Sequence, residues 1–203
     1  MATALPKLPI IEELARVLRR KGKPCAEVTG PWGSAKTLLA VQAAEALGCP
    51  LLILAADRIE AEAIYDDLST FVGEDGCTLF PAWEVLPTDT MSPADDIVAE
   101  RMNTLKRLAA ALEDERPLHA VLPVRSLLQY VIPRKQLAVD SITLEYGEEY
   151  DLDDLLSKLV KLGYTRDVMV EHRGDVSVRG GIVDIFPISS ELPYRIEFFG
   201  DEV

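Results

Sequence analysis

The chain has 203 residues, of which 48% are hydrophobic and 27% charged, so its composition is that of a globular protein and excludes a disordered or collagen-like chain. Its 21 basic and 34 acidic side chains give a net charge of −13, which opposes a large non-specific grip on a nucleic-acid backbone. The longest apolar stretch, 51–56, is far below the roughly 18 residues of a membrane span. Because the N-terminus also lacks a signal-peptide pattern, we expect a cytoplasmic protein with no membrane partner.

The cysteines and histidines indicate no metal site, disulfide framework or catalytic group. Cys25, Cys49 and Cys77 are odd in number, lie far apart and form no Cys-x-x-Cys pair. His119 and His172 are isolated, and no Ser, His and Asp grouping is legible. We therefore expect no catalytic residues and no metal.

The first half of the chain alternates short apolar runs with helical periodicity, the pattern of parallel strands joined by crossover helices. Strands are predicted at 25–29, 51–55, 77–80 and 119–122. Helices are predicted at 36–47, closed by Gly48, and at 60–71.

A third helix is predicted after Ser92, which can cap it, with Pro93 in the first helical position and Asp95 where a capping box places an acid. Its apolar stripe follows helical spacing and consists of Val98, Met102, Leu105, Ala109 and Leu112.

The pattern changes after about residue 130. A strand is predicted at 141–146, then a helix capped by Asp151 that runs to Leu162 and ends at Gly163, with Tyr150 and Leu155 spaced as a hydrophobic staple. Strands at 168–172, 176–186 (kinked at Gly180 and Gly181) and 194–199 follow, and their short turns indicate antiparallel pairing. The fold class is therefore an α/β parallel-sheet domain at 1–132 followed by a smaller α+β domain at 133–203.

A phosphate-binding loop is indicated where Gly30, Gly33, Lys36 and Thr37 stand between a predicted strand and helix, as in G-x-x-x-x-G-K-[ST]. The glycine expected before the lysine is Ala35, whose Cβ restricts the backbone and crowds the place of the phosphates. No predicted strand ends in the acidic pair that holds magnesium for hydrolysis. Two interpretations stay open, a turn retained for folding and a working nucleotide site, and we expect no ATP or magnesium cofactor.

Several stretches together resemble the N-terminal UvrB-like region of the bacterial transcription-repair coupling factor (Mfd) family. They are the loop 29–37, the segment 83–89 with Ser92-Pro93 and Asp96-Ile97, the run 123–127, and the motifs 178–187 and 190–202. The resemblance covers nearly the whole chain and rests on the order and spacing of these motifs.

The resemblance implies a degenerate RecA/helicase-like domain followed by a domain that recruits the nucleotide excision repair protein UvrA. It also implies that RNA polymerase and DNA are bound by other domains, so that this chain is an N-terminal fragment, not itself an enzyme, with little DNA binding of its own. The alternative is a fragment of the UvrB helicase that still binds ATP. UvrB carries a long aromatic hairpin after the third strand, whereas 80–92 offers about a dozen residues, too few for such a hairpin. Trp83 in this segment is interpreted as a loop residue buried against the domain.

A partner-docking face is predicted on the last strands. Residues two apart on a strand share a face, so Ile196 and Phe198 point to the core while Arg195 and Phe199 point outward. In the preceding strand, taken as the neighbour, Ser177 and Arg179 point outward too. Arginine and aromatic side chains dominate protein interfaces. The resemblance adds that these three positions contact UvrA in the family.

Other interpretations remain. The two arginines can instead form surface ion pairs with Glu197 or Asp184, with Phe199 covering the helix after Asp151. The chain can also be a generic nucleotide-binding domain without a repair role, which requires this face to be covered. The basic run at 16–23 can contact phosphates, but a solvated helix end is the favoured interpretation.

Overall fold

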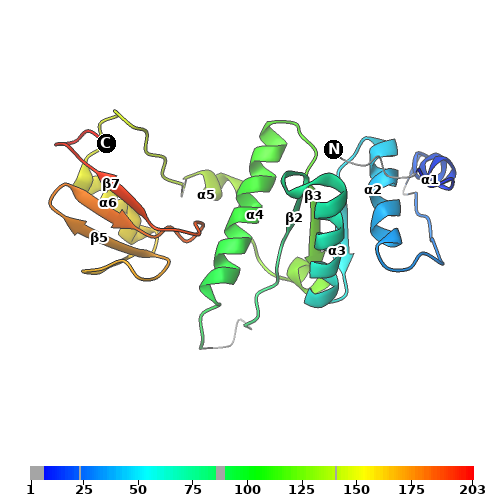
Figure 1. The fold of residues 1–203 in the computed structure, drawn as a ribbon, viewed down its shortest axis with the longest axis horizontal. Coiled ribbons are helices and arrows are strands. Elements are labelled where there is room, and N and C mark those ends of the chain that lie inside the picture. Colours follow the sequence, from blue (N-terminus) through cyan, green and yellow to red (C-terminus); the bar gives the residue numbers. More distant parts are fainter. Residues whose placement is uncertain (1–6, 23, 86–89, 140) are drawn as a thin grey trace. The chain divides into compact units, whose positions relative to one another are not determined.

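The computed structural model describes residues 7–22, 24–85, 90–139 and 141–203 (Figure 1). The chain forms two compact units, residues 1–87 with 104–130 and residues 88–103 with 131–203, and each unit has its own sheet. The α/β fold class is confirmed. The predicted domain ranges 1–132 and 133–203 stay a prediction. Among the described helices, none has the length and apolar character of a membrane span.

The sheet of the first unit has three parallel strands, β1 (Leu52–Ala55), β2 (Cys77–Leu79) and β3 (His119–Pro123), in the order β1-β3-β2. Every residue of the central strand β3 is buried, as expected for a strand covered on both faces. Helices α2 (Ala35–Leu47) and α3 (Arg58–Val72) pack against it. Their shared core with the strands consists of Val41, Ala55, Ala61, Leu68, Cys77 and Val121.

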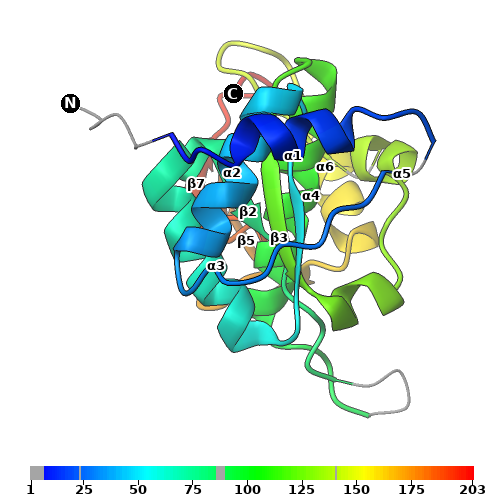
Figure 2. The same cartoon turned by 90° about the vertical axis from the view of Figure 1, so that its right-hand side faces the viewer.

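The helix ends follow the local sequence signals. Gly48 closes α2 with a φ of 67°, a left-handed conformation that favours glycine. Asp57 caps α3, since its Oδ1 accepts a hydrogen bond from the Glu60 amide at 2.9 Å. A further helix, α1 (Ile11–Leu18), lies beside α2 (Figures 1 and 2) and buries Ile11 and Leu14 against it. The predicted helices at 36–47 and 60–71 are therefore confirmed.

The predicted strand at 25–29 is wrong. Residues 24–30 are exposed and belong to no strand. In the described sheet β1 is an edge strand, without the neighbour that the pattern predicted. Its alternate residues Leu52 and Leu54, which share one face, are 63% and 49% exposed. A short apolar run is an ambiguous strand signal, because pairing depends on a partner distant in sequence.

Helix α4 (Asp95–Glu113) begins two residues later than Pro93, the predicted first position. Its predicted apolar stripe is displaced by one residue, since Leu112 is 68% exposed whereas Thr104 and Ala111 are buried. One residue corresponds to about 100° around a helix. Thr104 fixes this rotation, because its Oγ1 donates to the Leu79 carbonyl at 2.6 Å and lies 3.1 Å from the buried Thr78 Oγ1.

Trp83 is partly buried, close to its interpretation as a buried loop residue. Its backbone exchanges two hydrogen bonds with the Gln129 side chain, at 2.8 and 3.1 Å. Gln129 follows the short helix η2 (Val124–Leu128), and another short helix, η1 (Glu74–Gly76), precedes β2. Residues 86–89 of the motif 83–89, and Lys23 of the basic run, lie outside the described residues.

His119 of β3 is buried and bonds to Leu51, the residue before β1. Its Nδ1 accepts a hydrogen bond from the Leu51 amide at 3.0 Å, and burial lowers its pKa below the usual value. The unfolded chain therefore takes up the proton at a higher pH than the folded chain does. Protonation favours unfolding, so this contribution to the free energy of unfolding is complete above about pH 6.5 and falls as the pH drops below that value.

We expect His119→Asn to remove this pH dependence, because an amide oxygen can accept the same hydrogen bond without titrating in this range. Urea unfolding of both proteins at pH 7.5 and 5.5 measures it. The wild type should lose more stability than the variant on acidification, by no more than about 1.4 kcal/mol per pH unit. Equal losses would show that His119 carries no such linkage.

The sheet of the second unit has four strands in sequence order, β4 (Thr165–Arg166), β5 (Asp175–Arg179), β6 (Ile182–Ile185) and β7 (Tyr194–Glu197). Strands β4 and β5 are parallel, and the other neighbours are antiparallel. Helix α6 (Leu152–Lys161) covers one face of this sheet (Figure 1). The core between them consists of Leu155, Leu159, Val176, Val183, Ile185 and Phe198. A short helix, α5 (Arg134–Val139), precedes α6.

Helix α6 begins and ends as predicted. Asp151 Oδ1 accepts a hydrogen bond from the Asp154 amide at 2.8 Å, and Gly163 follows the helix with a φ of 94°. Tyr150 and Leu155 both pack into the core, as a hydrophobic staple requires.

Three strand predictions in this unit need correction. Residues 141–146 form no strand, although Ile142 and Leu144 do pack toward the core. Residues 168–172 form a loop, and the strand before it is the short β4. The single kinked strand predicted at 176–186 is the hairpin of β5 and β6, because Gly180, with a φ of 62°, and Gly181 make a two-residue turn.

Candidate functional site

The sheet face opposite α6 carries the predicted docking residues. Strand alternation sends Val176, Val183 and Ile196 toward α6, so their sequence neighbours point the other way. The register places these neighbours in two cross-strand rows, Ser177, Asp184 and Arg195 in one row and Arg179, Ile182 and Glu197 in the other. We call this surface the outer face of the sheet.

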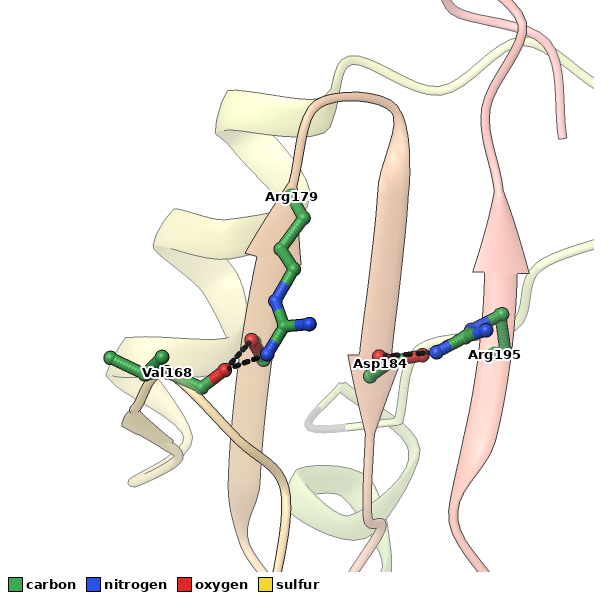
Figure 3. A network of polar contacts seen from close by, with 5 residues as sticks. Val168, Arg179, Asp184 and Arg195 are labelled. Carbon is green, nitrogen blue, oxygen red and sulfur yellow. Dashed lines mark hydrogen bonds and ion pairs between the residues drawn. The ribbon is translucent and has the colours of Figure 1, made fainter.

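Arg195 and Asp184 form a two-pronged ion pair on the outer face (Figure 3). Arg195 Nε donates to Asp184 Oδ1 at 2.7 Å, and Nη2 donates to Oδ2 at 2.9 Å. These hydrogen bonds lower the pKa of Asp184 below its usual value, and the charge of Arg179 acts in the same direction. The pair therefore stays ionised at neutral pH and fixes the Arg195 guanidinium while its side chain is 61% exposed.

Arg179 lies on the same face, but β6 separates it from β7 (Figure 3). The prediction that the two arginines stand on neighbouring strands is therefore wrong, because the glycine turn inserts β6 between them. Arg179 Nη2 donates to the carbonyl oxygen of Val168 at 2.7 Å. Within the described part of the chain, no carboxylate forms a salt bridge with Arg179, although its charge does interact with that of Asp184.

Phe199 follows β7 and its ring is almost fully in solvent, with 94% of the residue exposed. Its neighbour Phe198 is 8% exposed and packs in the core. Two backbone hydrogen bonds fix the chain at these two residues. The Phe198 amide donates to the Gly181 carbonyl at 2.7 Å, and the Phe199 amide donates to the Glu202 carbonyl at 2.8 Å. At this exposure, Phe199 does not cover α6, which was the alternative position.

The outer face also has features that the sequence did not reveal. Ser177, predicted to point outward into solvent, is 3% exposed, because its Oγ donates to the Val168 carbonyl at 2.9 Å and the loop after β4 covers it. Val168 itself lies in a segment predicted as a strand. Alternation alone could not find this contact, since it depends on where the loop folds back.

The predicted phosphate loop folds into a turn in which two backbone amides donate hydrogen bonds to carbonyl groups of the same loop. Gly30 and Gly33 have φ values of 105° and 51°. The Ala35 amide donates to the Trp32 carbonyl, and the Lys36 amide donates to the Gly33 carbonyl, both at 3.2 Å. A phosphate nest needs such amides free to point at the anion. Lys36 is exposed.

Asp67 of α3 holds the two hydroxyl groups of this loop. Ser34 Oγ donates to Asp67 Oδ1 at 2.7 Å, and Thr37 Oγ1 donates to Oδ2 at 3.1 Å. In a working loop the hydroxyl at the position of Thr37 is a magnesium ligand. Here a carboxylate from a helix engages this hydroxyl directly. The loop as folded therefore leaves neither hydroxyl free for a magnesium nucleotide, and sequence reasoning missed Asp67 because it lies 30 positions after Thr37.

We expect no saturable binding of magnesium ATP to the chain at physiological concentration, because the Ala35 and Lys36 amides and the Thr37 hydroxyl are already engaged. Isothermal titration calorimetry measures this directly. Micromolar affinity that disappears in Lys36→Ala would contradict the prediction and restore a working nucleotide site.

The comparisons with known proteins agree with the motifs. Residues 142–203 match the family model of the UvrB interaction domain. The chain is 41% identical to the transcription-repair-coupling factor of Mycobacterium tuberculosis (strain CDC 1551 / Oshkosh) over 172 residues, 83% of this chain and 14% of that protein. It is 33% identical to that of Escherichia coli (strain K12) over 171 residues, 84% of this chain and 14% of that protein.

The chain thus belongs to the family of transcription-repair-coupling factors. A third relative, from Myxococcus xanthus, is 34% identical over 203 residues, 91% of this chain and 17% of that protein. These matches confirm the resemblance, and the chain spans about a sixth or less of the length of these coupling factors. The matched UvrB interaction domain, 142–203, contains Arg179, Arg195 and Phe199.

Proposed function

We propose that the chain is a docking module of a transcription-repair coupling factor and that its outer face recruits UvrA to coupled repair. One observation carries the proposal: inside the matched UvrB interaction domain, Arg179, Arg195 and Phe199 all reach solvent, and the Phe199 ring is 94% exposed beside the buried Phe198. Arginine and aromatic side chains are the types that supply most binding energy in protein interfaces.

The proposal assigns no catalysis to this chain. Within the described residues, no cluster of His, Cys, Asp and Glu could hold a metal ion. The hydrogen bond between the Thr37 hydroxyl and Asp67 supports a vestigial nucleotide site. In this proposal the loop is retained as a turn that leads into α2 and has no strand before it. On the same resemblance, contacts with RNA polymerase and DNA belong to other domains of the longer coupling factors, and the protein acts in the cytoplasm.

The test is a titration of purified UvrA with the whole chain, without DNA. We expect saturable binding, since the outer face needs neither DNA nor another domain to present its side chains. The absence of a complex at micromolar concentrations would contradict the proposal. If the chain instead binds ATP but not UvrA, the UvrB-like alternative takes its place.

A further inference from the structure

The loop that joins β4 to β5, residues 167–174, displays two apolar side chains beside Arg179. Val168 is 76% exposed and Met169 is 59% exposed. Single exposed apolar residues are common on protein surfaces and need no explanation. Val168 and Met169 are consecutive and lie next to a candidate docking face. Whether they can contribute to binding depends on whether the loop holds them in one conformation.

Side chains hold this loop at both ends. At its start the Val168 carbonyl accepts hydrogen bonds from Ser177 Oγ at 2.9 Å and from Arg179 Nη2 at 2.7 Å. At its end Asp175 Oδ2 accepts from the Glu171 and His172 amides, at 3.1 and 2.7 Å. The loop is therefore fixed to β5, and the two apolar side chains are presented in an ordered conformation, which lowers the entropy cost of binding.

A hollow of about 410 Å³ lies between this loop and β5. Among the groups that line it are the guanidinium-bearing residues Arg166 and Arg179 and the apolar Val168. Asp167 also lines it as a carboxylate, and its Oδ1 accepts a hydrogen bond from the Val168 amide at 2.5 Å. Two cations therefore face one anion, and the net positive charge of the hollow is complementary to a further carboxylate.

We propose that Val168 and Met169 are a second apolar anchor of the docking face, and that Arg179 is a positioning residue for their loop. The occupant is a segment of UvrA in which an acidic side chain enters the hollow beside Arg166 and Arg179, with apolar side chains on Val168 and Met169. The docking face then extends across the sheet, from this loop past Arg179 and Arg195 to Phe199. This inference rests on the proposed function.

The first test is the double variant Val168→Ser, Met169→Ser in a UvrA titration. Because the loop is held through the Val168 carbonyl, this change leaves its hydrogen bonds in place. We expect UvrA affinity to fall about tenfold with an unchanged melting temperature. The matched control is Ile59→Ser on α3, which removes an apolar side chain of 79% exposure in the other unit and should bind UvrA as the wild type does.

The second test separates positioning from contact by hydrogen exchange of the chain alone, without UvrA. Arg179→Ala should speed amide exchange at Asp167 and Glu171, whose amides are hydrogen-bonded to the Val176 carbonyl and to Asp175 Oδ2. Arg195→Ala should not, because Arg195 bonds Asp184 and not the loop. Arg179→Lys, which keeps a donor, should restore part of the protection. Unchanged exchange in Arg179→Ala would overturn the positioning role.

Wild-type affinity in the double serine variant, together with weakened binding by Phe199→Ala, would overturn the second anchor and leave the proposed function standing. A wild-type chain that does not bind UvrA at all would overturn both.

Discussion

Arg179→Ala and Arg195→Ala are each expected to weaken UvrA binding about 30-fold, while the melting temperature of the chain stays nearly unchanged. Both side chains are exposed and neither packs in the core, so their removal costs the fold little. In the complex, each guanidinium would be shielded from water and bonded to a UvrA acceptor, where a lost charged hydrogen bond costs more than it does in solvent.

Arg179→Ala and Arg195→Ala should lower UvrA affinity for different reasons. Asp184 fixes the Arg195 guanidinium before binding, so Arg195 brings an ordered donor to the interface. Arg179 also holds the Val168 loop, so Arg179→Ala should remove a contact and disorder a neighbouring one. The two losses can therefore be unequal, but both should be clear in a calorimetric titration.

Arg58→Ala is the matched control. Arg58 of α3 is 65% exposed and its Nε pairs with Glu62 Oε1 at 2.6 Å, much as Arg195 pairs with Asp184. It lies in the other unit, so its loss should leave UvrA affinity unchanged. If Arg58→Ala and Arg195→Ala weaken binding equally, the effect comes from the net charge of the chain and the outer face has no special role.

Gly181→Ala is expected to cost roughly 2 to 4 kcal/mol of stability in the second unit. A Cβ at this position would lie 2.5 Å from the Phe198 carbonyl oxygen, closer than real contacts allow. The Gly181 carbonyl also accepts the Phe198 amide at 2.7 Å, so the backbones cannot separate without breaking the bond that holds the end of β7. UvrA binding should fall with the fold, because Phe198 and Phe199 follow β7 directly.

Hydrogen exchange of the β6 and β7 amides in the whole chain, alongside urea unfolding, measures this loss. Gly180→Ala is the control at the neighbouring position. Its φ of 62° is unfavourable for alanine, but a Cβ there has no neighbour within 4 Å, so the cost should be about 1 to 2 kcal/mol. Equal losses of stability in the two variants would show that the close approach of Gly181 to the Phe198 carbonyl oxygen is not the reason why glycine is needed at position 181.

Local signals in the sequence located α2, α3 and α6, although they placed the start of α4 two residues too early. Gly48, Asp57 and Asp151 mark helix ends through interactions within a few residues, and such signals do not depend on the rest of the fold. Alternation also assigned Phe198 to the core and Phe199 to solvent. For the same reason, the side of the sheet on which Arg195 lies could be predicted before its neighbours were known.

Contacts between distant segments could not be read in this way. The Gly180-Gly181 turn looks like a kink unless the pairing of β5 with β6 is known, and this error placed β5 beside β7. Asp67 closes the phosphate loop from another helix, and no spacing rule connects it to Thr37. Residues 25–29 have the composition of a strand, but no strand of the described chain pairs with them.

The most direct measurement of the docking proposal is a calorimetric titration of UvrA with the whole chain carrying Phe199→Ala. This ring is 94% exposed, so its loss should leave the fold intact, and the result does not depend on the ion pair that complicates Arg195. The proposal predicts at least about tenfold weaker binding with an unchanged melting temperature. Wild-type affinity in this variant would contradict the docking role proposed for the outer face together with Phe199.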